Sequence, residues 1–265
     1  MKLVASALCI VLACASTLFA VVKTEFVEYR HGDAVLQGFL AYDDAAVGKK
    51  PGILIAHEWW GMNDYVQLRA KQMAALGYVA FALDMYGKDK ATTDRNKAGE
   101  LAKPFRDDRQ IMRDRALAGL AVLKKNDHVD PEKLVAMGYC FGGTVVLELA
   151  RAGTDLDGVI SFHGGLGTTM PAKAGEVKAK VLVLHGADDP NVPEKEVAAF
   201  KKEMADADVK MQLVAYEGAV HAFTNPKAGD DPSKGAAYNE NADRESWNAM
   251  KQFLSELFTL PEVQG

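Results

Sequence analysis

The sequence predicts an α/β fold: a mostly parallel central sheet with helices on both faces and an N-terminal antiparallel hairpin. Three observations predict it. Short apolar runs typical of buried strands alternate with stretches of helical periodicity from residue 52 onward. Two shorter strands around the turn signal Gly32-Asp33 precede that alternation. The chain has 265 residues, 49% of them hydrophobic and 25% charged, which suits one domain with a substantial core.

The strands are predicted from apolar runs bounded by turn residues. The hairpin strands span 25–30 and 35–40, and their turn residues tolerate the backbone of a tight reversal. Later strands are predicted over 52–56, 78–83, 133–137, 159–162, 181–184 and 212–214. Because helices separate these later strands, they should pair in parallel.

The helices are predicted from helical periodicity between the strands. They span 65–76, 107–123, the segment after Gly142, 194–205 and 239–258. Two segments are expected to be irregular: 84–106 as a loop with a short helix, and 224–237 as a polar loop. Both leave strand ends at the side of the sheet where ligands bind, so both are expected to shape a pocket.

Residues 1–20 are interpreted as a signal peptide, followed by one domain over 21–265. Lys2 precedes an uncharged apolar run that ends at small residues such as Ala20, a pattern typical of export to the periplasm or secretion. A permanent membrane anchor is the rival, but the run is marginal in length and contains Ser and Thr. Lipidation at Cys14 remains an alternative, because residues 11–14 loosely resemble a lipobox.

Charge and cysteine content narrow the possible partners. The net charge of −5 and the absence of a basic stripe argue against nucleic acid. No stable membrane span is expected, and a monomer is favoured. The three cysteines are Cys9, Cys14 and Cys140, and cleavage after residue 20 would leave only Cys140, without a disulfide partner in the chain.

The motif G-Y-C-F-G-G at 138–143 indicates a nucleophile. It lies between a predicted strand and a predicted helix, the context in which a G-x-S-x-G elbow exposes its central residue. Gly138 and Gly142 permit the sharp turn, and the N-terminus of the following helix favours a thiolate at Cys140. A buried structural cysteine is the alternative, which the flanking glycines argue against.

An acid and a histidine follow Cys140 in the chain order of α/β-hydrolases. His221 follows the strand near 212–216 and is the predicted base, while Asp188 and Asp189 follow the strand over 181–184. Asp189 is chosen as the acid from its spacing within that loop. Asp188 is expected to cap the N-terminus of a helix or to form an Asx turn. Three further histidines are expected near the site because they lie at strand ends: His57, His163 and His185.

The loop after the strand over 52–56 is expected to complete the site. In this architecture it donates one amide of the oxyanion hole, here Trp59, and the residue after the nucleophile, Phe141, donates the other. Glu58 in the same loop is a candidate site residue, with a solvated carboxylate or a partner of Arg69 as alternatives. No metal-ligand spacing, dinucleotide motif or phosphate loop occurs, so neither metal nor cofactor is expected.

Five segments together resemble the dienelactone hydrolase family over about residues 25–258: H-E-W-W-G-M-N-D-Y, L-D-M-Y-G, G-Y-C-F-G-G, H-G-A-D-D-P-N-V-P and H-A-F. The resemblance implies a triad of Cys140, His221 and Asp189. It also implies that Glu58 contacts the thiol and helps to convert it to thiolate.

The resemblance also suggests residues for substrate binding. Family members that act on dienelactone hold its carboxylate with two arginines, and the matching positions here are Lys88 and Asn225. Neither offers a bidentate guanidinium. Tyr86 and Trp60 are further candidates for contact with substrate.

The expected activity is hydrolysis of a lactone or carboxylic ester through a cysteine thioester, without metal. The alternatives are a general small-ester esterase with no dienelactone activity, and a hydrolase-fold binding protein without catalysis. A thiol redox protein is disfavoured because no second cysteine lies near Cys140 in the sequence.

Overall fold

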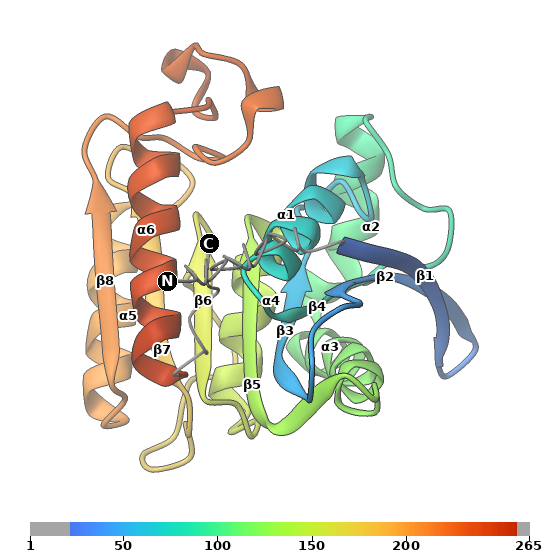
Figure 1. Cartoon of the computed structure of the whole chain (residues 1–265). Helices are drawn as coiled ribbons and strands as arrows, with labels where there is room; N and C mark the ends of the chain where they lie inside the picture. Colours follow the sequence, from blue (N-terminus) through green and yellow to red (C-terminus); the bar gives the residue numbers. More distant parts are fainter. Residues whose placement is uncertain (1–21, 259–265) are drawn as a thin grey trace, which may run out of the picture.

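The computed structural model describes residues 22–258, which form an eight-stranded sheet covered by helices on both faces (Figure 1). The strand order is β1-β2-β4-β3-β5-β6-β7-β8. The strands are β1 (Val22–His31), β2 (Ala34–Asp43), β3 (Lys50–Ala56), β4 (Val79–Leu83), β5 (Val129–Tyr139), β6 (Gly158–Phe162), β7 (Lys180–Gly186) and β8 (Met211–Tyr216). The predicted α/β-hydrolase fold is confirmed.

The hairpin and the parallel strands pair as the sequence predicts. β1 and β2 are antiparallel around a turn in which Gly32 has φ 56°, and β2 joins β4 in antiparallel orientation. All pairs from β4 through β3, β5, β6 and β7 to β8 are parallel. The carboxyl ends of six strands therefore meet at one edge of the sheet, where loops can combine side chains distant in sequence.

Two hydrophobic layers fix the helices to the sheet. One face packs against α1 (Asp64–Ala75) and α6 (Glu240–Leu257), and the other against α3 (Arg109–Lys124), α4 (Phe141–Arg151) and α5 (Glu194–Asp206). The central strands are buried on both faces, because successive side chains point into different layers.

The helix α4, which follows the nucleophile, is buried along its whole length. Its Glu148 is fully buried and receives ion pairs from Arg113 at 2.7 Å and from Arg151 at 3.2 Å. A buried carboxylate is tolerated only when charged donors replace its water. The contact with Arg113 ties α3 to the second half of α4.

The prediction for 84–106 is partly wrong, because α2 (Arg95–Asp107) is a full helix of 13 residues. The side chain of Asp94 caps the N-terminus of α2. The side chain of Asp108 caps the N-terminus of α3, which begins directly after α2. One side of α2 is buried, through Ala98, Ala102 and Phe105. Because the helix is polar overall, these few apolar residues give only a weak helical pattern in the sequence.

The predicted polar loop over 224–237 contains two short 3₁₀ turns, Pro226–Ala228 and Pro232–Lys234. The predicted signal peptide and the lipidation alternative at Cys14 lie outside the described residues. Within residues 22–258, no helix has the length and apolarity that a membrane crossing requires.

Candidate active site

Cys140 stands at a sharp turn between β5 and α4. Its backbone has φ 54° and ψ −117°, a region that non-glycine residues rarely adopt and that stores strain. A Cβ on Gly138 would lie 2.1 Å from the carbonyl oxygen of Gly142, and one on Gly142 would lie 2.1 Å from that of Ala56. Because these neighbours are backbone atoms, only glycine fits at either position.

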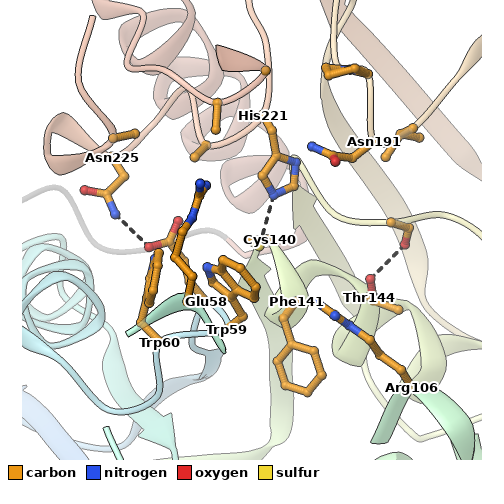
Figure 2. Close-up of a pocket in the computed structure, with 18 of the residues that line it drawn as sticks. Glu58, Trp59, Trp60, Arg106, Cys140, Phe141, Thr144, Asn191, His221 and Asn225 are labelled. Carbon is orange, nitrogen blue, oxygen red and sulfur yellow. Dashed lines mark hydrogen bonds between the residues drawn. The ribbon is translucent and has the colours of Figure 1, made fainter. Parts of the chain in front are cut away.

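A continuous chain of contacts joins the predicted triad. The Sγ of Cys140 lies 3.0 Å from Nε2 of His221 (Figure 2). Nδ1 of His221 lies 2.8 Å from Oδ2 of Asp189. Asp189 is buried, whereas Asp188 is exposed. Asp189 is therefore the aspartate that orients His221, and Pro193, not an aspartate, precedes α5.

The loops around the triad are held by their own hydrogen bonds. The second oxygen of Asp189 accepts from the amide of Asn191 at 2.8 Å, which fixes the carboxylate in its turn. The backbone of His221 bridges to Ala236 and accepts from the amide of Ala237 at 3.0 Å. The polar loop after β8 thus braces the base.

The electrostatics of the triad favour an ion pair. Burial lowers the pKa of His221, but the neighbouring Cys140 and Asp189 outweigh it and raise the pKa well above its usual value. The protonated form of the His221 imidazole is therefore favoured, and this imidazole faces the Sγ of Cys140 at 3.0 Å.

The oxyanion loop follows β3 and lies beside the elbow. No described residue accepts a hydrogen bond from the amides of Trp59 and Phe141, and both residues line the pocket at Cys140. Tyr86 is buried, and its hydroxyl donates to the carbonyl oxygen of Trp59 at 3.1 Å. Tyr86 thus supports the loop from behind and is not among the residues that line the pocket.

Glu58 is buried in the same loop and faces Asn225. Its Oε2 accepts from Nδ2 of Asn225 at 2.6 Å, and both residues line the pocket (Figure 2). Burial raises the pKa of Glu58 to about 7, although the hydrogen bond from Asn225 and the charge of His221 oppose the rise. The hydrogen bond of the Cys140 thiol goes to His221, so the contact between Glu58 and the thiol stays a prediction.

Arg69 does not pair with Glu58. It bonds instead to Asp243 at 2.6 Å and to the carbonyl oxygen of Thr224 at 2.8 Å. The carboxylate of Glu58 therefore depends on an amide donor rather than on a guanidinium, which is why burial dominates its pKa.

The structure places Lys88 outside the pocket lining, so its contact with substrate stays a prediction. Its ammonium pairs with Glu28 on the outer hairpin, and it is not among the pocket-lining residues. Gly87 has φ 126°, and the amide of Lys88 then bonds to the carbonyl oxygen of Val35 at 3.0 Å. These contacts turn the chain toward β2 and away from the site. Trp60, by contrast, lines the pocket as predicted.

The pocket is an open cleft of about 1780 Å³, larger than most small-molecule sites. Trp59 and Trp60 form an aromatic wall on one side. Sequence reasoning missed the residues at the other side, where Arg106 at the end of α2 and Arg109 at the start of α3 enter the lining with Thr144. Figure 2 shows Arg106 on the far side of Phe141 from Glu58.

The two arginines differ in their freedom. Arg106 is exposed and lies over the Trp59 ring at 5.9 Å, whereas Arg109 is largely buried and donates to the carbonyl oxygen of Gly167 at 3.3 Å. The capping aspartates Asp94 and Asp108 were the signals that could have located both helices.

In the described part of the chain, no group of three or more His, Cys, Asp or Glu residues could hold a metal ion.

Comparison with known proteins agrees with this geometry. A model of the dienelactone hydrolase family matches residues 36–258. A protein of Saccharolobus solfataricus that carries a provisional carboxymethylenebutenolidase name is 27% identical over 264 residues, covering 85% of this chain and 96% of that protein.

Two solved structures are similar over nearly the whole described chain. The dienelactone hydrolase-like promiscuous phosphotriesterase P91, from metagenomic libraries, has a TM-score of 0.84 and 38% identity over 89% of this chain and 99% of that one. The structure named m3DLH has a TM-score of 0.85 and 35% identity, with the same coverage. The family match spans most of the sequence, and the fold agrees with it: this chain belongs to the dienelactone hydrolase family and is an ester or lactone hydrolase.

Proposed function

We propose that this hydrolase cleaves a carboxylic ester or lactone through a thioester on Cys140, with His221 as base and acid and Asp189 as the residue that orients it. The observation that carries the proposal is the chain of contacts at 2.8 Å and 3.0 Å that ends at a strained elbow. Nucleophile, base and orienting carboxylate in hydrogen-bond reach are the signature of covalent acyl transfer.

The first half of the reaction forms the thioester. The thiol proton resides on His221, and the thiolate attacks the carbonyl carbon of the substrate. The amides of Trp59 and Phe141 receive the developing oxyanion. When the tetrahedral intermediate collapses, the carbon–oxygen bond to the leaving group breaks, and His221 gives its proton to the departing alkoxide or enolate.

The second half restores the enzyme. His221, now neutral, takes a proton from water, and the resulting hydroxide attacks the thioester carbonyl. Collapse of this intermediate releases the carboxylic acid and the thiolate of Cys140, beside the protonated His221.

Turnover of a neutral aryl ester by wild type and by Cys140→Ala tests the nucleophile. Wild type should release the phenol with an initial burst, and its intact mass should increase by one acyl group. Cys140→Ala should lose activity by several orders of magnitude, because triad members act as a unit. Wild-type activity in Cys140→Ala would refute the thioester mechanism, and failure of wild type to become acylated would favour a non-catalytic binding protein.

The same assay with a dienelactone tests the substrate class. At the two positions that match the arginines of the dienelactone enzymes, Lys88 lies outside the pocket and Asn225 carries no charge, whereas Arg106 and Arg109 line the pocket elsewhere. Because neither matching position places a cation in the pocket, we expect a neutral ester to be hydrolysed at least as well as a dienelactone. A dienelactone preferred by more than about tenfold in kcat/KM, which is about 1.4 kcal/mol, would contradict this.

Hydrolysis of a phosphotriester is a second candidate. It is favoured by the 38% identity to a structure described as a promiscuous phosphotriesterase. A thiolate can attack phosphorus as it attacks a carbonyl, forming a sulfur–phosphorus bond as the aryloxide leaves. Release of the aryloxide from a diethyl aryl phosphate by wild type, lost in Cys140→Ala, would support it; no release would exclude it.

Export also remains a proposal, supported by the apolar N-terminal run. N-terminal sequencing of the protein recovered from its native host should begin after residue 20. Retention of Met1 would contradict cleavage, and a diacylglyceryl group on Cys14 would favour the lipoprotein alternative.

A further inference from the structure

A buried histidine that the proposed triad does not use lies directly behind the nucleophile. His163 follows β6 and is fully buried. Its φ of 39° places a non-glycine residue in the left-handed region, a strained conformation that persists only where the surroundings enforce it. Its own amide donates to the carbonyl oxygen of Leu184 at 2.8 Å, so it is fixed between the ends of β6 and β7.

Both ring nitrogens of His163 have partners, and these partners determine which nitrogen carries the proton. The N–H of Cys140 is shared between two acceptors, the carbonyl oxygen of Phe162 at 3.0 Å and Nδ1 of His163 at 3.1 Å. Because a backbone N–H can only donate, Nδ1 must be unprotonated. Nε2 therefore carries the proton and donates to Oγ1 of Thr224 at 2.7 Å. The nucleophile and the loop that follows the base are thus joined through one imidazole.

Thr224 is itself held by residues of the helical layer. Its Oγ1 lies 2.6 Å from the hydroxyl of Tyr65, and its carbonyl oxygen accepts from Arg69 at 2.8 Å. Arg69 pairs with Asp243 at 2.6 Å, so the chain of polar contacts extends from the elbow to α1 and α6. A buried polar network with every member paired is rigid, and removing one member leaves the others unsatisfied.

His163 also contacts the base directly. Its ring meets that of His221 edge to face, with centroids 5.4 Å apart at 64°. Both nitrogens of His221 are already used by Asp189 and Cys140, so this ring contact is what limits rotation of His221 about the line between those partners. His163 is therefore in contact with both Cys140 and His221.

His163 must stay neutral for these contacts to hold. Burial lowers its pKa well below the usual value, and the charges of His221 and Arg69 lower it further. A proton on Nδ1 would set two donors, this nitrogen and the Cys140 amide, against each other. It would also place a second cation beside protonated His221. The other ionisable group that packs nearby is Tyr139, whose ring centroid lies 6.1 Å away.

We propose that His163 is a positioning residue for the Cys140–His221 pair. Through Nδ1 it fixes the amide of Cys140, and through its ring it fixes the imidazole of His221, so the thiolate–imidazolium pair is assembled before substrate binds. This inference rests on the proposed function, in which Cys140 is the nucleophile.

Two substitutions separate the two nitrogens. The side-chain oxygen of His163→Asn can take the place of Nδ1 and accept from Cys140, whereas the amide group of His163→Gln can take the place of Nε2 and donate to Thr224. The readout is the pH profile of Cys140 alkylation by iodoacetamide, which reports thiolate directly and needs no ester turnover. Thermal unfolding and kcat/KM on a neutral aryl ester are measured in parallel.

His163→Gln should shift the alkylation profile to higher pH and lower both alkylation and kcat/KM at neutral pH by about 10- to 100-fold, as expected when a reacting group is misplaced. His163→Asn, which keeps an acceptor for the Cys140 amide but loses the ring against His221, should shift the profile less than His163→Gln. Thr224→Val leaves Nε2 without its acceptor, so the proton is no longer held on Nε2 and Nδ1 is no longer kept free to accept from Cys140. It should therefore shift the profile in the same direction as His163→Gln, and it serves if the glutamine variant does not fold.

His128→Asn is the control. The ring of His128 stacks on that of Tyr42 with the centroids 4.4 Å apart, and neither residue is among those that line the pocket. The alkylation profile of this variant should match wild type. The proposal is overturned if His163→Gln and Thr224→Val unfold at lower temperature yet keep the wild-type profile, or if His163→Asn and His163→Gln change it equally. Because alkylation reports on the thiol alone, loss of the proposed esterase function would be seen separately in Cys140→Ala.

Discussion

Replacing Glu58 with glutamine should remove a pH dependence from the stability of the fold. Glu58 is only 3% exposed, and burial raises its pKa from an ordinary 4.5 to about 7. Between these two values the folded protein holds the proton, whereas the unfolded chain releases it. The stabilisation is therefore complete below the ordinary pKa of the carboxyl and is lost as pH rises through about 7.

The size of this effect follows from the shift. Each pH unit between the folded and unfolded pKa values of Glu58 changes the free energy of unfolding by about 1.4 kcal/mol, so the whole window accounts for about 3 kcal/mol. The glutamine side chain of Glu58→Gln would keep an acceptor for Asn225 but has no proton to release. The variant should match wild type near pH 4 and be more stable by up to about 3 kcal/mol near pH 8.

Urea denaturation followed by tryptophan fluorescence at several pH values measures this difference. Glu217→Gln is the control. That side chain is exposed, so its replacement should alter little the dependence of the free energy of unfolding on pH. Parallel profiles for wild type and Glu58→Gln across the window would refute the reasoning. They would mean that Glu58 is ionised in the folded protein at low pH, with the negative charge compensated by a neighbour.

Three further predictions concern the elbow, the acid and the excluded lysine. Gly142→Ala should destabilise the fold by about 3 kcal/mol or more, because the added Cβ would lie 2.1 Å from the Ala56 carbonyl oxygen. The thermal midpoint of the variant should fall sharply, and an unchanged midpoint would contradict the geometry of the turn. Asp189→Asn should lower kcat by about 10³- to 10⁴-fold, because His221 loses a contact that raises its pKa and sets its tautomer; a loss below tenfold would assign the acid elsewhere. Lys88→Ala should leave kcat/KM on neutral and anionic esters unchanged within about twofold, and a selective loss on the anionic ester would return Lys88 to the site.

Much of the fold was readable from local patterns. The parallel strands are apolar runs because both of their faces are buried, and the hairpin turn is marked by Gly32 with a positive φ. The full length of helix α2 was not predicted, because its buried residues are few and its composition is polar. A helix of that kind is stabilised by packing against its neighbours, which a local pattern does not contain.

The site divides in the same way. The elbow could be predicted because its sharp turn requires glycine at Gly138 and Gly142, and the two glycines lie close together in the sequence. The positions of Lys88 and Arg106 could not, because each depends on the direction in which a loop leaves the sheet. Lys88 is turned toward β2 by a backbone bond to Val35, and Arg106 reaches the pocket only because α2 packs on α3.

The sequence by itself determined the order of the strands and of most helices along the chain, and it marked Cys140 as the predicted nucleophile, since these follow from periodicity, glycine sterics and chain order. Only the tertiary structure decided that Asp189 rather than Asp188 meets His221, and that Glu58 faces Asn225. It alone brought His163 against both Cys140 and His221. Those pairings join residues up to 167 positions apart, and their distances are set by how the carboxyl ends of β3 and of β5 to β8 align at one edge of the sheet.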